Sequence, residues 1–94
     1  MTGVEVRLPA VLADVAGGRR IVVMSPAPVC LGALLDGLEA DLPAVVRRIR
    51  DETGALRRFV NVYVDGEDVR HLDGTATPLC DGCLVQVLPS VAGG

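Results

Sequence analysis

The residues with the clearest chemical potential are the last ones of the chain, Ser90-Val-Ala-Gly-Gly94, which we call the tail. From Pro89 to Gly94 the sequence carries no charge and no side chain larger than valine. When extended, these residues would reach about 20 Å at roughly 3.3 Å per residue, which suits entry into a narrow channel of another protein. Because glycine has no Cβ, Gly93 and Gly94 would leave the terminal carboxylate unshielded for attack on phosphorus or by a sulfur nucleophile.

A Gly-Gly pair by itself is weak evidence for such chemistry. Val15-Ala-Gly-Gly18 repeats the same four residues inside the chain, where no free carboxylate exists. Chain ends without regular structure are also common. The terminal position of the second copy, after the pattern of a folded domain, is what indicates carboxylate chemistry at Gly94.

The basic residues exclude several kinds of enzyme. All nine are arginine, and the chain contains no lysine. It therefore lacks a phosphate-binding P-loop lysine and a Schiff-base lysine, so any nucleotide chemistry must be done by a partner. The net charge of -3 and the presence of only two aromatic residues, Phe59 and Tyr63, argue against a nucleic-acid binder. With no leader and no apolar run long enough for a membrane span, we expect a cytoplasmic protein.

The cysteines offer a second candidate for chemistry. Cys80-Asp-Gly-Cys83 has the spacing of zinc and redox motifs, but a closed zinc site needs four ligands, and only Cys30 and His71 remain. A redox motif of the thioredoxin type would open a helix, whereas this one spans a predicted turn. We interpret the pair as structural, with a disulfide across the turn as the oxidised alternative. Cys30, at an expected helix start, is a candidate reactive thiol, and His71 has no partner for a catalytic triad.

Two hydrophobic periods divide the chain into strands and helices. Alternating apolar and polar residues predict strands, and a stripe at i, i+3, i+4, i+7 and i+11 from Leu31 to Leu42 predicts a helix that Pro43 ends. A long loop joins the first two strands, and Asp65-Gly66 favours a tight hairpin turn. The expected strands cover residues 4–8, 19–24, 58–64, 67–70 and 84–88, and the expected helices cover residues 31–42 and 43–52.

This order predicts an α+β fold of the β-grasp, or ubiquitin-like, type. We expect a mixed sheet with one main helix packed on one face, a domain over residues 1–89, and a flexible C-terminal Gly-Gly tail over residues 90–94. If the valines of segment 58–64 face the helix, the residues between them face the open side of the sheet. An exposed face with aromatic residues commonly marks a partner site. The residues predicted to dock a partner there are Phe59, Asn61 and Tyr63.

Several of these motifs occur together in one known family. The chain resembles the ThiS/MoaD family of ubiquitin-like sulfur carriers, and within it the carriers of cysteine biosynthesis. The resemblance covers nearly the whole chain and is weakest between residues 10 and 28. It is carried by Arg58-Phe-Val-Asn-Val-Tyr-Val-Asp-Gly-Glu-Asp-Val-Arg70, Asp81-Gly82, Leu88-Pro89 and Val91-Ala-Gly-Gly94.

The resemblance implies a carrier that is not itself an enzyme. In such a family, Gly94 would be adenylated by a ubiquitin-activating-type enzyme that uses ATP and Mg²⁺, with Gly93, Ala92 and Val91 recognised as the tail enters. The acyl adenylate would become a thiocarboxylate, which donates its sulfur to an acceptor enzyme. In the cysteine branch, the acceptor is an activated serine on a cysteine synthase, and a metalloprotease then trims the tail. The chain itself would bind no cofactor.

Two other functions remain open on the sequence alone. The chain could be a ubiquitin-like modifier that forms isopeptide bonds through Gly94, or a plain β-grasp interaction module with a frayed end. Conjugates of high mass would indicate the first. A deletion of Gly94 without effect would indicate the second.

Overall fold

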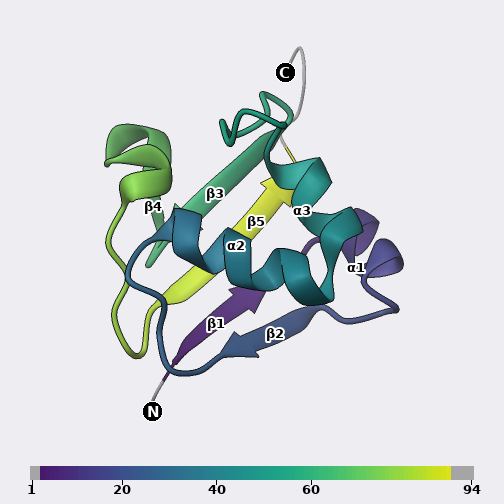
Figure 1. The fold of residues 1–94 in the computed structure, drawn as a ribbon, viewed down its shortest axis with the longest axis horizontal. Coiled ribbons are helices and arrows are strands. Elements are labelled where there is room, and N and C mark those ends of the chain that lie inside the picture. The colour runs from purple at the N-terminus through teal and green to yellow at the C-terminus, as the bar shows by residue number, and fades with distance from the viewer. Residues whose placement is uncertain (1–2, 90–94) are drawn as a thin grey trace.

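The computed structural model describes residues 3–89, which form a five-stranded mixed sheet (Figure 1). Across the sheet the strand order is β2-β1-β5-β3-β4. The central strand β5 runs parallel to β1 and antiparallel to β3, while β1 and β2 form an antiparallel pair, as do β3 and β4. The strands are β1 (Val4–Arg7), β2 (Ile21–Met24), β3 (Val60–Val64), β4 (Glu67–Asp68) and β5 (Leu84–Pro89).

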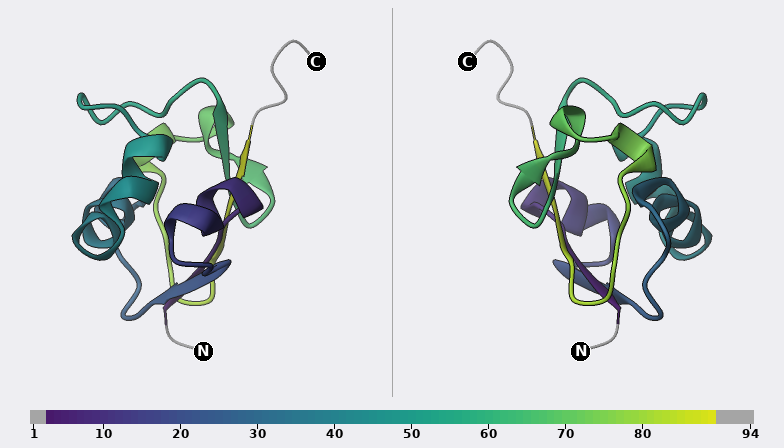
Figure 2. Two further views of the ribbon diagram at one scale, coloured as in Figure 1. Left: turned by 90° about the vertical axis from the view of Figure 1, so that its right-hand side faces the viewer. Right: turned by 90° about the vertical axis from the view of Figure 1, so that its left-hand side faces the viewer.

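The helices lie over one face of this sheet (Figure 2). The longest, α2 (Leu31–Asp41), is followed at once by α3 (Pro43–Ile49), with proline at the first position of α3, where its missing N–H costs nothing. A third helix, α1 (Ala10–Val15), follows β1 and contacts α3. Two 3₁₀ turns, η1 (Val69–His71) and η2 (Gly74–Ala76), lie between β4 and β5.

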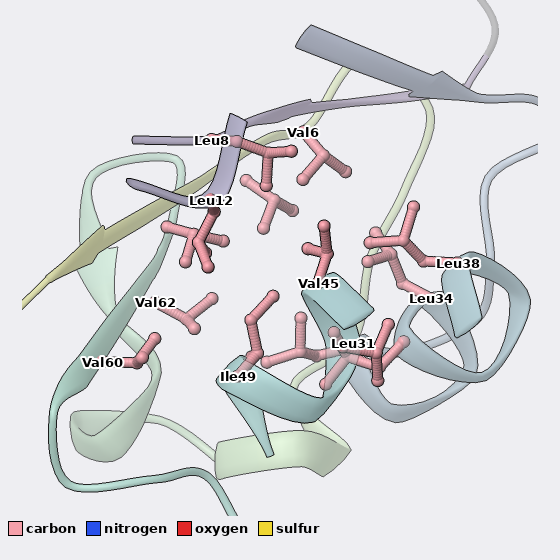
Figure 3. Close-up of a cluster of buried hydrophobic side chains, with 14 of the residues drawn as sticks. Val6, Leu8, Leu12, Leu31, Leu34, Leu38, Val45, Ile49, Val60 and Val62 are labelled. Atoms are coloured by element: carbon pink, nitrogen blue, oxygen red, sulfur yellow. The ribbon is translucent and has the colours of Figure 1, made fainter. Parts of the chain in front are cut away.

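The core fills the space between the sheet and these helices (Figure 3). Alternate residues of a strand face the same side, so the buried valines of β1, β3 and β5 point toward the helices. The leucines of α2 lie on one face of that helix and point toward the sheet. Burying one such side chain contributes about 1.5 to 3 kcal/mol relative to leaving it exposed. The fully buried side chains include Val4, Val6, Val62, Val85, Leu31, Leu34, Leu35, Leu38, Val45, Val46 and Ile49.

This arrangement confirms the predicted β-grasp fold, with three main corrections to its elements besides the later starts of β2 at Ile21 and β3 at Val60. The loop between the first two strands contains α1, so three α-helices, rather than one main helix and a short one, cover residues 3–89. A helix of six residues is too short to display the helical period on which the prediction relied. It nevertheless contributes Leu12 and Ala13 to the buried residues.

The other two corrections shorten predicted elements. The helix after Pro43 ends at Ile49 instead of Glu52, because Arg50 has an extended backbone with φ -130° and ψ 155°. The strand expected over residues 67–70 stops at Asp68, whose carboxylate accepts a hydrogen bond from the backbone N–H of Arg70 at 2.9 Å. That bond caps the start of η1 and ends the strand.

Within residues 3–89, none of the helices has the length and apolar character needed to cross a membrane. The predicted tail, with Val91, Ala92, Gly93 and Gly94, lies outside the described residues.

Candidate functional site

The end of β5 fixes where the chain leaves the domain. Pro89 is paired with Val60, the first residue of β3, and β5 is the central strand. Pro89 therefore lies in the middle of one end of the sheet, and residues 90–94 follow it in the sequence. Any surface that works together with the predicted tail is expected around this point.

An apolar groove of about 150 Å³ lies at this end of the sheet. Two of its side chains are largely exposed, Phe59 at 67% and Val11 at 62%. Exposed apolar side chains of this size beside one another are typical of partner sites. The groove is lined by Pro9, Val11, Leu12, Arg48, Phe59, Val60, Val87, Leu88 and Pro89.

The structure separates Phe59 from the other two predicted docking residues. Phe59 lies in a turn, and β3 begins only at Val60, so strand alternation does not place its ring. The ring lines the groove together with Leu12 of α1 and Arg48 of α3, both on the helix side of the sheet. The prediction of one shared open face was therefore wrong for Phe59.

Asn61 and Tyr63 do lie on the open face of β3, and both are half-buried there. The side-chain oxygen of Asn61 accepts a hydrogen bond from Nη1 of Arg70 at 3.0 Å. Tyr63 stands in register with Gln86 on one side and Asp68 on the other. Asn61 is thus engaged within the fold, whereas most of the Phe59 side chain is exposed.

Arg70 holds the turn that carries Phe59. Its Nη2 atom donates to the carbonyl oxygens of Arg57 and Val60, each at 2.8 Å, so one guanidinium joins η1 to both ends of the segment around Phe59. This role of Arg70 was not predicted from the sequence, although Arg70 is the last residue of the motif over residues 58–70. No local pattern could have revealed it, because the partners lie 9 to 13 residues away in the chain.

Positive charge borders the groove despite the net charge of -3. Within residues 3–89, Arg47, Arg48 and Arg58 are exposed and form no ion pair, while Arg50 is tied to Asp36 of α2 at 2.8 Å. Of these three, Arg48 lines the groove. An unpaired guanidinium beside an apolar groove favours a partner surface with an exposed carboxylate.

The loop after α3 is ordered by a carboxylate. Asp51 accepts hydrogen bonds from the hydroxyl of Thr53 at 2.6 Å and from the backbone N–H groups of Thr53 and Ala55. Chiefly through the hydroxyl of Thr53, these bonds lower the pKa of Asp51. Asp51 therefore stays ionised and stabilises the loop instead of acting as an acid.

The cysteine motif lies at the other end of β5. Cys80 is exposed and Cys83 is buried, and burial, reinforced by the Cys80 thiol and Asp65, raises the pKa of Cys83 to about 11. Among residues 3–89, no cluster of three or more His, Cys, Asp or Glu side chains is arranged to hold a metal ion. Cys30 precedes α2 without a side-chain capping hydrogen bond, and His71 is exposed in η1.

The sequence of this chain is similar to those of several known proteins. The model of the ThiS family matches residues 6–94. The chain is 43% identical to the sulfur carrier protein CysO of Mycobacterium tuberculosis over 93 residues, which cover 97% of this chain and 98% of that protein. It is 38% identical over 90 residues to small archaeal modifier protein 3 of Haloferax volcanii, covering 96% and 97% of the two chains.

Solved structures agree with these matches. The crystal structure of Mycobacterium tuberculosis CysO superimposes with a TM-score of 0.85 at 41% identity, covering 94% of this chain and 99% of that one. CysO in the BexX/CysO complex of Amycolatopsis orientalis matches with a TM-score of 0.86 at 34% identity, covering 97% and 99%. On the fold and on these matches together, the chain belongs to the ThiS family.

Proposed function

We propose that this protein is a sulfur carrier whose working group is the α-carboxylate of Gly94. The observation that carries the proposal is the identity of 43% with a sulfur carrier protein over nearly the full length of both chains. The family match also runs through Gly94 itself. The compact domain then serves as a handle, and partner enzymes supply the catalysis.

The chemistry follows from the weak reactivity of a carboxylate. A ubiquitin-activating-type enzyme with ATP and Mg²⁺ joins the Gly94 carboxylate to AMP and releases pyrophosphate. Hydrosulfide then attacks the carbonyl carbon and displaces AMP, leaving a thiocarboxylate. This chain contributes the carboxylate of Gly94, and the absence of lysine is consistent with ATP chemistry that belongs to the partner.

The groove beside Pro89 is the surface we propose for docking that partner. It is adjacent to the point where the chain leaves the sheet, and it combines exposed apolar side chains with the cation of Arg48. A partner bound there would hold the domain at a fixed distance from the active-site channel that receives Val91, Ala92 and Gly93. Asn61 and Tyr63 lie on the open face of β3 and do not line this groove.

Replacing Phe59 with alanine tests the docking surface. Since an aromatic side chain at the centre of an interface is often worth more than 1.4 kcal/mol, we expect the Kd for the activating enzyme to rise about tenfold. The melting transition should change little, because Phe59 is 67% exposed. Isothermal titration calorimetry with the activating enzyme measures the first effect, and calorimetric melting measures the second.

Val29→Ala is the matched control, since Val29 is 78% exposed and lies outside the groove. It should leave the Kd unchanged. An unchanged Kd for Phe59→Ala would contradict docking through this groove. A large loss of stability in that variant would show that Phe59 serves the fold instead of the partner.

For the acceptor, we propose the activated serine of a cysteine synthase, followed by a metalloprotease that releases the new cysteine. The proposal is supported by the similarity of this chain to CysO and by the resemblance of its motifs to those of the carriers of cysteine biosynthesis. The test is to mix the thiocarboxylate form with a cysteine synthase and an activated serine and to measure the intact mass. Addition of one cysteine residue to the tail supports the assignment, and an unchanged thiocarboxylate directs the search to another sulfur acceptor.

The similarity to an archaeal modifier protein favours a second candidate function. The same Gly94 adenylate can be attacked by a lysine amine, which gives an isopeptide bond and releases AMP. A modifier would produce ladders of conjugates in extracts of the native host, detected by an antibody to this chain. A pure carrier would not.

A further inference from the structure

Two cysteines at the start of β5 stand outside the proposed carrier chemistry. Cys80 and Cys83 flank Asp81-Gly82 in a turn that is closed by a hydrogen bond from the N–H of Cys83 to the carbonyl of Cys80 at 3.1 Å. Their Sγ atoms are 3.2 Å apart, and the N–H of Cys80 also donates to the Cys83 sulfur at 3.3 Å. The two thiols are therefore in direct contact.

The turn is braced from outside by the start of β1. Asp81 accepts a hydrogen bond from the N–H of Gly3 at 2.9 Å, and the N–H of Gly82 donates to the carbonyl of Gly3 at 2.8 Å. The carbonyl of Cys83 accepts from the N–H of Glu5 at 3.1 Å. Gly82 has φ of 91°, a conformation that glycine adopts without strain. The contact between the thiols is thus imposed by backbone bonds that do not depend on sulfur chemistry.

We propose that Cys80 and Cys83 form a redox-active dithiol that small-molecule disulfides convert reversibly to an intrachain disulfide. A turn closed in this way brings the two Cα atoms within about 7 Å, and disulfides need roughly 4.4 to 6.8 Å. From 3.2 Å, the sulfur atoms must approach by about 1.2 Å to reach bonding distance. Side-chain rotation in a preformed turn can supply that movement.

The two cysteines take different parts in the reaction because their exposure differs. Cys80 is exposed, so its thiolate attacks a disulfide RSSR and releases one RS⁻, which leaves Cys80 joined to SR. Cys83 is buried, and burial raises its pKa to about 11, so it remains a thiol next to the mixed disulfide on Cys80. It then loses its proton to solvent, attacks the Cys80 sulfur and releases the second RS⁻. Two thiols are oxidised to one disulfide, and RSSR is reduced to two RSH.

The third cysteine is the main competitor for this pairing. Cys30 is half-buried and forms an isolated β-bridge with Pro78, two residues before Cys80. Within residues 3–89 its sulfur forms no hydrogen bond with either member of the pair, whereas those two sulfur atoms are 3.2 Å apart. The test is therefore best done in a Cys30→Ser background, which removes the competitor.

The experiment treats the folded, full-length Cys30→Ser protein with oxidised glutathione and follows intact mass and peptide maps. We expect loss of two hydrogens, no retained glutathione, a link between Cys80 and Cys83, and full reversal by dithiothreitol. Adding Cys83→Ala should trap one glutathione on Cys80. Adding Cys80→Ser should leave the protein unmodified, because Cys83 is buried.

A glutathione that stays on Cys80 while Cys83 is present, or a disulfide that forms only in denaturant, would overturn the proposal. The assay uses no partner enzyme, no ATP and no tail chemistry. A variant that lacks Gly94 should close the disulfide as the full chain does, so failure here is distinguishable from failure of the carrier function. Far-ultraviolet circular dichroism of each variant confirms that an unreactive protein is folded.

Discussion

Deletion of Gly94 is expected to reduce adenylation of this protein by more than about 100-fold without changing its melting transition. Removing one residue moves the terminal carboxylate by about 3.3 Å, and a misplacement of about 1 Å in an active site can already cost 100-fold. The domain should be unaffected, because the deleted residue lies beyond Pro89, where β5 ends. ATP–pyrophosphate exchange with the activating enzyme measures the rate.

Ser90→Ala is the control for this deletion, since it alters the tail but keeps its length. It should exchange pyrophosphate at close to the rate of the unaltered protein. If the deletion variant also did so, activation would not depend on the position of the Gly94 carboxylate, and the special role assigned to Gly94 would be contradicted.

Replacement of Ile49 by alanine is expected to have the largest effect on stability. Ile49 is fully buried in α3 and belongs to the same core cluster as Val60 and Val62 (Figure 3). A cavity of this kind costs about 2 to 5 kcal/mol, a large part of the roughly 5 to 15 kcal/mol that stabilises a domain. We expect the melting temperature to fall by at least roughly 10 °C.

Ile49→Val is the conservative control and should cost only about 0.5 to 1.5 kcal/mol. Urea unfolding at one temperature compares the two variants. Below its melting transition, the Ile49→Ala variant should still be adenylated, because the substitution lies in the core of the domain and the reacting carboxylate belongs to Gly94. Similar losses for the two variants would contradict the packing described for α3.

The predictable part of this fold is the part with long hydrophobic repeats. Alternation over several residues indicated β1, β3 and β5, and the leucine stripe indicated α2, because burial of one face enforces a period. The helix α1 has only six residues, which do not complete two turns, so its pattern could not be told from a loop. Its side chain Leu12 is nevertheless part of the core.

The candidate site was less predictable because it depends on contacts between distant segments. The exposure of Phe59 could be expected, but its side of the sheet could not, since β3 begins one residue later. The groove needs Val11 from α1 and Arg48 from α3, and nothing in the local sequence brings them together. The spacing of Cys80 and Cys83 predicted their proximity, whereas only the structure shows that one is exposed and the other buried.

The intact mass of this protein, isolated from its native host under conditions that protect thioacids, tests the central claim most directly. The account predicts a species heavier by one exchange of oxygen for sulfur, located by fragmentation at the carboxylate of Gly94. A protein found only with its unmodified carboxylate or in isopeptide conjugates, when sulfur demand is high, would contradict the assignment as a sulfur carrier.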